Sequence, residues 1–255
     1  MKCLVLIKEV PDTEAKIVIA DDGKSIVKTD LKYILNPYDE YAIEEATKLA
    51  EEKNAECTLV AAGNAEMTKS IRNAIAKSAN KMGNIAFQNV IHLQIDGTIE
   101  TNGLAEKVAE IAAEIKPDLV FLGKQYIDND NYLMAPFLAD KMGFACATVV
   151  TKIDYSGDSL TVQREIEGGT EVIDIKMPAV ISLQKGVNEP RYAGMKGIMN
   201  AKKIAIDVRE TTLSDPLITT IKMEMPPQKD AGKQFSGDNQ VEELVKALKE
   251  EAKAL

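Results

Sequence analysis

The sequence has few of the groups that enzymes use for acid–base or nucleophilic chemistry. Among its 255 residues it has one histidine, His92, which lies in an apolar run typical of a strand, and we predict a structural role for it. No Ser-His-Asp order, HExxH sequence or GxxxxGK[ST] loop is present. A hydrolase or a transferase is therefore not expected.

Cysteine is also scarce. Cys3, Cys57 and Cys146 are odd in number, lie in apolar runs and form no CxxC pair. This pattern opposes a disulfide framework and a zinc site, and we predict that the three residues behave as small core hydrophobes. No metal site is expected.

Long apolar runs and an excess of basic residues are absent. No stretch approaches the roughly 18 apolar residues of a membrane span, and the apolar run at the start is too short for a signal peptide. We expect a cytoplasmic protein, with the mitochondrial matrix as the weaker alternative. The net charge of −9 opposes nucleic-acid binding and leaves proteins or nucleotides as expected partners.

The chain does contain short apolar runs that alternate with amphipathic segments. The runs at 3–7, 57–62, 90–95 and 119–122 predict strands, and a helix is expected to start at Asn36 and Pro37 with Asn36 as its N-cap. This alternation predicts an α/β fold: a mainly parallel, Rossmann-like sheet that binds an adenine nucleotide and is flanked by helices. Added antiparallel strands are expected between residues 146 and 183.

The last part of the chain differs in pattern. We expect an α/β nucleotide-binding domain at 1–208 and a C-terminal arm at 209–255, ending in an amphipathic helix with Val241, Leu244, Val245 and Leu248 on one face. The arm either packs on its own domain or lies over a partner.

Polar loops follow several of the expected strands. Gly123 and the polar residues up to Asn131 follow the run at 119–122, and Asn36 and Gly63 are expected at the same edge of the sheet. Ligands bind in open α/β sheets at the carboxyl ends of strands, and a glycine there admits a phosphate to backbone N–H groups. The three loops together predict an adenine-nucleotide site.

The segment 188–199 predicts an exposed docking loop. Pro190 restricts the backbone before it, and Gly194 and Gly197 flank Met195, which has no apolar periodicity to bury it. An exposed flexible hydrophobe on a polar loop is typical of a binding surface. The alternative is that Met195 folds back onto its own domain.

Short motifs along nearly the whole chain resemble those of electron transfer flavoprotein β subunits. They are Asn36-Pro37 with Glu44-Glu45-Ala46, Gly123-Lys124-Gln125 with Ile127-Asp128, Arg164-Glu165 with Gly168-Gly169, Pro178-Ala179-Val180, Asn188-Glu189-Pro190-Arg191-Tyr192, and Pro226-Pro227-Gln228 with Ala231-Gly232. Each motif is short, but their order and spacing together are specific.

The resemblance implies an electron carrier rather than an enzyme. It implies a heterodimer with a larger α subunit that holds the FAD, while this subunit binds AMP in a structural role. Electrons would come from acyl-CoA or related flavin dehydrogenases and pass to a membrane quinone reductase. No direct membrane insertion is implied.

The resemblance also assigns residues. With Gly63 from the loop pattern, the nucleotide site would comprise Leu6, Asn36, Pro37, Tyr38, Asp39, Ala62, Gly63, Gly123, Lys124, Gln125, Tyr126, Ile127, Asp128, Asn129, Asp130, Asn131, Tyr132, Leu133 and Met134. The docking loop would comprise Arg191, Tyr192, Ala193, Gly194, Met195, Lys196, Gly197, Ile198, Met199 and Asn200, with Met195 as the anchor. Glu165 would help to position the mobile flavin domain.

Two alternatives remain open. The sequence after Asp130 departs from the family, where small or polar residues are usual, because Asn131 is followed by Tyr132 and Leu133. A bifurcating form would bind a second FAD in place of AMP and oxidise NADH. A free-standing nucleotide-binding α/β module would form a homodimer and need no flavin-binding partner.

Overall fold

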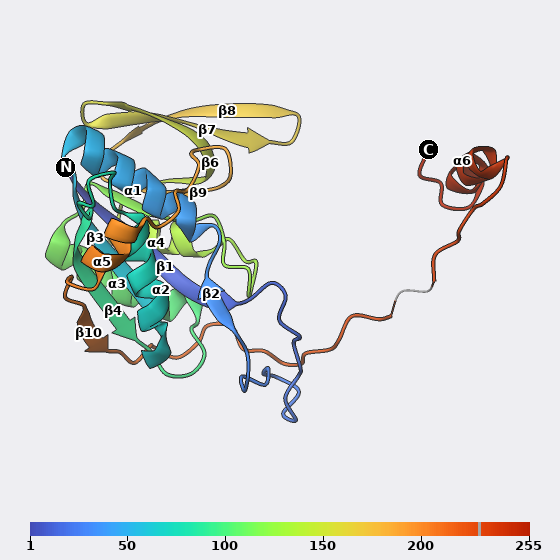
Figure 1. The fold of residues 1–255 in the computed structure, drawn as a ribbon, viewed down its shortest axis with the longest axis horizontal. Coiled ribbons are helices and arrows are strands. Elements are labelled where there is room, and N and C mark those ends of the chain that lie inside the picture. Colours follow the sequence, from blue (N-terminus) through green and yellow to red (C-terminus); the bar gives the residue numbers. More distant parts are fainter. Residues whose placement is uncertain (229–230) are drawn as a thin grey trace. The chain divides into compact units, whose positions relative to one another are not determined.

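The computed structural model describes residues 1–228 and 231–255, and its main feature is one large twisted sheet (Figure 1). The strand order is β10-β4-β3-β1-β5-β9-β6-β7-β8, and neighbouring strands from β10 to β6 run parallel. The parallel strands are β10 (Asp207–Glu210), β4 (Phe87–Gln94), β3 (Glu56–Gly63), β1 (Lys2–Pro11), β5 (Leu119–Gly123), β9 (Ala179–Leu183) and β6 (Ala145–Ser156). The expected α/β class is confirmed.

Antiparallel strands extend the sheet at one edge. The long strand β6 also pairs with β7 (Ser159–Ile166), which pairs with β8 (Gly169–Lys176), as expected for this part of the chain. The short strand β2 (Tyr33–Leu35) pairs with the end of β1. Neither β2 nor β10 was predicted, because each is too short to show an apolar period.

Helices cover both faces of the sheet. On one face lie α1 (Asp39–Lys53) and α2 (Thr68–Lys77), joined to β3 by the 3₁₀ turn Ala65–Met67, with α5 (Met195–Ala201) against α2 (Figure 1). On the other face lie α3 (Thr101–Ile115) and α4 (Met134–Met142). The core strands are buried on both sides, which explains their continuous apolar runs.

The chain forms two compact units. The first comprises Met1–Val18 and Val27–Thr220, and the second comprises Ile19–Ile26 and Ile221–Leu255. Within the second unit, the N–H group of Met223 donates to the Gly23 carbonyl at 2.7 Å, and α6 (Gln240–Glu250) buries none of its residues. The expected division at residues 208 and 209 stays a prediction.

The strand order places a switch point beside β1. The chain passes from β1 to β3 and β4 on one side, and then crosses to β5 and β9 on the other. At such a point the loops that follow two adjacent strands run in opposite directions. A crevice then forms at the carboxyl ends of the strands. The loops after β1 and β5 meet there.

Candidate functional site

A buried carboxylate joins the elements at this edge. Asp39 is the first residue of α1 and is fully buried. Its Oδ1 accepts from the Gly123 N–H at 3.0 Å and from Asn36 Nδ2 at 2.9 Å, and its Oδ2 accepts from the Lys8 N–H at 2.9 Å. One side chain therefore holds together β1, β5 and the start of α1.

Burial raises the pKa of Asp39 to about 7, while the three donors act in the opposite direction. Desolvation penalises the charged form, and hydrogen bonds to the carboxylate favour it. The value lies far above the usual range of an aspartate, so this group titrates near neutral pH.

Asn36 does not cap α1. The helix begins three residues later, and the Asn36 side chain instead reaches across the edge, donating to Asp39 and, at 2.9 Å, to the Gln125 carbonyl. Its Oδ1 also accepts from the Ile127 N–H at 3.4 Å. The N-cap prediction was wrong because Asn36 supports the loop after β5, a contact that local sequence cannot reveal.

Gly123 is required by close packing within the protein. A Cβ atom at this position would lie 2.6 Å from Asp39 Oδ1 and 2.6 Å from the Cβ of Tyr38. Real Cβ atoms do not make such contacts, so α1 can approach the end of β5 only because residue 123 is glycine. Protein atoms occupy the space beside this glycine.

Both lysines at the edge have partners in the chain. Lys8 Nζ lies 2.5 Å from Asp128 Oδ2 and 4.8 Å from the centre of the Tyr126 ring. Lys124 Nζ lies 4.8 Å from the ring centre of Tyr38 and 5.5 Å from that of Tyr132. These are cation–π distances, so both positive charges are already engaged.

The start of α4 is held by Asn131. The Asn131 side chain donates to Thr101 Oγ1 at 3.0 Å and accepts from the Leu133 N–H at 3.1 Å. An N–H group at the start of a helix is a common partner of a phosphate. Here the Asn131 amide oxygen accepts from the N–H group of Leu133, the residue just before the first helical residue, Met134.

The inner part of the expected nucleotide site is tightly packed. Leu6 and Ala62 are fully buried, and Tyr126 and Met134 are exposed by only 3% and 5%. All four belong to the hydrophobic core cluster beneath α3 and α4. The buried Tyr126 hydroxyl and Gln125 Oε1 have no hydrogen-bond partner among the described residues. The fold gathers the expected residues, and the side chains of Leu6, Ala62, Tyr126 and Met134 pack into one core cluster.

Gly63, the last residue of β3, and His92, in β4, lie on the opposite face of the sheet from Ala62. His92 is buried in β4, and its Nε2 lies 3.3 Å from the Gly63 carbonyl. Burial lowers the pKa of His92. This placement agrees with a structural histidine. Cys3 and Cys57 are buried as predicted, but the prediction for Cys146 was wrong because its strand position is exposed.

The expected docking loop contains a short helix, α5. Tyr192 is 94% exposed, Met195 75% and Met199 61%. Met195 and Met199 are one helical turn apart and share a face. With Ile198, which is also exposed, the segment displays four large apolar side chains, and Met195 does not fold back onto its own domain.

Contacts from α1 fix the chain just before α5. The Arg191 guanidinium lies 2.8 Å from a Glu44 carboxylate oxygen and 2.6 Å from one of Glu51. Hydrogen bonds from Arg191 to both glutamates raise its pKa. Asn188 Nδ2 donates to Glu45 Oε2 at 2.9 Å. The Arg191 side chain is therefore turned inward, towards α1.

The back of α5 rests on α2. A Cβ at Gly197 would lie 2.5 Å from the Ala76 carbonyl oxygen, so glycine allows the two backbones to approach closely. Arg72 Nη1 donates to the Ala201 carbonyl at 2.6 Å and to the Ile204 carbonyl at 2.5 Å, and Asn200 Nδ2 donates to the Gly83 carbonyl at 3.0 Å. The exposed face of α5 is held on a fixed support.

The sequence alone did not reveal these supporting residues. Arg72 lies in α2, far from residue 201 in the chain, and nothing local marks it. Glu44 and Glu51 are seven residues apart in α1, which places them on one face of the helix, and this spacing was an available signal. Another available signal was Lys8, a charged residue that directly follows the apolar run at 3–7.

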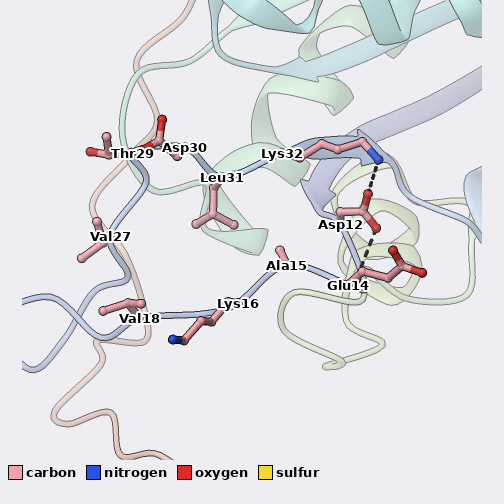
Figure 2. A pocket seen from close by; sticks show the side chains of 10 residues that line it. All are labelled: Asp12, Glu14, Ala15, Lys16, Val18, Val27, Thr29, Asp30, Leu31 and Lys32. Atoms are coloured by element: carbon pink, nitrogen blue, oxygen red, sulfur yellow. Dashed lines mark hydrogen bonds and ion pairs between the residues drawn. The ribbon is translucent and has the colours of Figure 1, made fainter.

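The open cavities among the described residues include two in the first unit. One, of about 450 Å³, lies between segments 12–18 and 27–32, where Asp12 pairs with Lys32 at 2.5 Å (Figure 2). The other, of about 660 Å³, is lined by residues that include Glu9, Pro37 and Asn64. Neither is lined by residues 123–134. Glu165, in β7, is exposed beside the turn to β8.

Every helix within residues 1–228 and 231–255 is too short or too polar to span a lipid bilayer. The same residues contain no cluster of three or more His, Cys, Asp or Glu side chains suited to a metal ion.

Comparison with known proteins gives consistent matches. A family model described as the electron transfer flavoprotein domain matches residues 24–214. The chain is 34% identical to the electron transfer flavoprotein subunit beta of Bacillus subtilis (strain 168), with 100% of each chain covered. It is 35% identical to that of Homo sapiens, covering 98% of this chain and 97% of the relative. For Syntrophomonas wolfei the identity is 34%, with 94% and 92% covered.

Proposed function

Because the chain belongs to the family of electron transfer flavoprotein beta subunits, we propose that it works as the electron-carrier subunit of a heterodimer with a larger α subunit. The complex accepts electrons from an acyl-CoA dehydrogenase or a related flavin dehydrogenase and passes them to a quinone reductase. The FAD, held mainly by the α subunit, would supply the electron-carrying chemistry. The β subunit itself carries out no substrate chemistry. A cytoplasmic location stays a prediction.

The observation that carries this proposal is the exposed face of α5. Met195 and Met199 face solvent, while the helix beneath them is bound to α1 and α2 by Arg191, Arg72 and Gly197. A rigid support lowers the entropy that is lost on binding, and the flexible methionine side chains adapt to the partner. Met195 is the proposed anchor for the dehydrogenase.

The lack of catalytic groups agrees with a carrier. Electron transfer between flavins requires close approach and mobility of the flavin domain rather than acid–base groups. The β subunit holds the dehydrogenase at α5, which leaves the flavin domain free to sample orientations. Glu165 on the β7–β8 hairpin is the proposed residue for positioning that domain.

The nucleotide of the β subunit is a separate question. The resemblance implies AMP, or a second FAD in a bifurcating form. The packing of Leu6, Ala62 and Tyr126 opposes both, because each ligand would have to enter the same filled space. The carrier function does not depend on this site.

The competing function is a free-standing nucleotide-binding module. It requires neither a docking helix nor a partner for the second unit. The exposed apolar residues of α5 and α6 favour a subunit over such a module.

Replacement of Met195 tests the proposed anchor. In the purified heterodimer, Met195→Ala should raise the apparent KM of dehydrogenase-coupled reduction about 30-fold, since losing a central anchor costs about 2 kcal/mol. The flavin absorption spectrum should not change. Val172→Ala, which removes another exposed apolar side chain from β8, is the matched control. Equal KM values for the two variants would contradict the anchor role.

A further inference from the structure

Tyr126 lies where the family resemblance places a nucleotide. Tyr126 is 3% exposed and belongs to the core cluster that also contains Leu6, Ala62, Leu104 and Met134. In a site that a ligand has left, the lining side chains keep surface that water can reach. Leu6, Ala62 and Leu104 are 0% exposed, so not even a water molecule fits beside them. The cluster is already filled.

The ring is also held in place from the outside. Lys8 Nζ lies 4.8 Å from the ring centre and pairs with Asp128 at 2.5 Å. Lys8 is itself buried, and its backbone N–H donates to Asp39. Moving the Tyr126 ring outward would break its cation–π contact with the buried Lys8 and disturb the partly buried ion pair that Lys8 forms with Asp128.

Polar groups at the outer part of the site already have partners within the chain. The Asn131 side chain accepts from the N–H group of Leu133, the residue before α4. Lys124 lies between the rings of Tyr38 and Tyr132. The nearby loop carries Asp128, which pairs with Lys8, and Asp130, which accepts a hydrogen bond from the Gln125 side chain.

We propose that Tyr126 takes the structural place of the nucleotide in this β subunit, which binds neither AMP nor a second FAD. The core beneath α3 and α4 is completed by the chain's own side chains. The heterodimer then carries one nucleotide cofactor, the FAD of the α subunit. This inference rests on the proposed function, because that function defines the heterodimer and the family in which the site is expected.

Removal of the Tyr126 hydroxyl distinguishes this proposal from the alternative that Tyr126 binds a nucleotide. The hydroxyl is buried and has no partner among the described residues. If the ring alone fills the site, Tyr126→Phe removes only an unsatisfied polar group and should leave the thermal midpoint unchanged or raised. If the hydroxyl bonds a nucleotide, the same change should release that nucleotide and lower the midpoint.

The direct test is the nucleotide content of the purified heterodimer. The complex is denatured, and the released nucleotides are separated and quantified by chromatography. We expect one FAD and no AMP per heterodimer. One AMP, or a second FAD, would overturn the inference and leave the carrier function intact. A complex without FAD would contradict the proposed function instead.

Variants of Tyr126 give a second test. Tyr126→Ala should lower the thermal midpoint of the heterodimer because it opens a cavity in the core, and added AMP should raise that midpoint again by filling the cavity. AMP should not shift the midpoint of the wild type or of Tyr126→Phe. A shift in either of these two proteins would overturn the proposal. The measurements on the wild type and on Tyr126→Phe still test the proposal if the alanine variant does not fold.

Discussion

Asp39 is the residue on which the sheet edge most depends. It is fully buried and receives hydrogen bonds from β1, β5 and Asn36, so a single carboxylate sets how α1 meets the two strands. A buried acid that joins three elements couples the stability of the edge to pH. The same contacts fix the position of the loop that carries Tyr126.

The pH dependence follows from the raised pKa of Asp39. Burial raises this pKa to about 7, whereas an unfolded aspartate titrates near 3.9. Between these values the folded state binds a proton that the unfolded state lacks. The contribution of Asp39 to the free energy of unfolding is therefore fully present below about pH 4. It is lost as the pH rises towards 7, a loss on the order of 4 kcal/mol.

Urea unfolding of wild type and Asp39→Asn between pH 4 and 8 checks this dependence. Asparagine cannot titrate, so the difference in unfolding free energy between the two proteins should change with pH in that window. A difference that is constant from pH 4 to 8 would show that Asp39 does not titrate there.

At the scale of elements, α5 depends on its neighbours more than on its own sequence. It is a seven-residue helix with two glycines at or beside its start, and isolated helices of this length are not stable. Its shape comes from α2 and α1. The function of the docking surface should therefore be sensitive to residues that never touch the partner.

Arg72 tests this dependence. Arg72→Met removes the donor to the carbonyls of Ala201 and Ile204, and the loss of such a charged hydrogen bond costs about 1 to 3 kcal/mol. Hydrogen exchange of residues 195–201 should accelerate, and the apparent KM for the dehydrogenase should rise. Lys69→Met, on the same helix, is the control. Unchanged exchange in Arg72→Met would refute the supporting role.

The elements show how far sequence alone can lead. The buried strands β1, β3, β4 and β5 were predictable because each is a continuous apolar run covered on both faces. The start of α1 could not be predicted, because the side chain of Asn36 bonds the loop after β5 across the sheet edge and does not cap the helix. Short elements such as β10 and α5 form through tertiary contacts, which local patterns do not encode.

The candidate site shows the same limit. The positions of the glycine and polar loops identified the sheet edge, and the exposure of Met195 followed from the flanking glycines. The packing of Tyr126 could not be deduced, because its burial results from Leu6, Leu104 and Met134 meeting in the fold. The sequence thus predicted which residues meet at this sheet edge but not how tightly they pack.

At the scale of the whole molecule, the second unit has an apolar face without a partner in the chain described. Val241, Leu244 and Val245 are exposed on one side of α6, and all described residues of this helix are unburied. An exposed amphipathic helix is typical of a surface that binds another protein. We expect the α subunit to cover this face.

Paired variants of α6 test that interface. Leu244→Ser should raise the dissociation constant of the heterodimer at least tenfold, which corresponds to about 1.4 kcal/mol. Glu243→Ser, on the polar side of the same helix, should have little effect. Sedimentation of each variant with the α subunit measures the difference. Equal dissociation constants for the two variants would contradict binding of the α subunit to the apolar face of α6.

The most direct test of the central claim is co-expression of the chain with the α subunit, followed by purification and flavin analysis. A carrier subunit should yield a yellow heterodimer with one FAD that a flavin dehydrogenase reduces. A colourless homodimer of this chain that does not bind the α subunit would contradict the account.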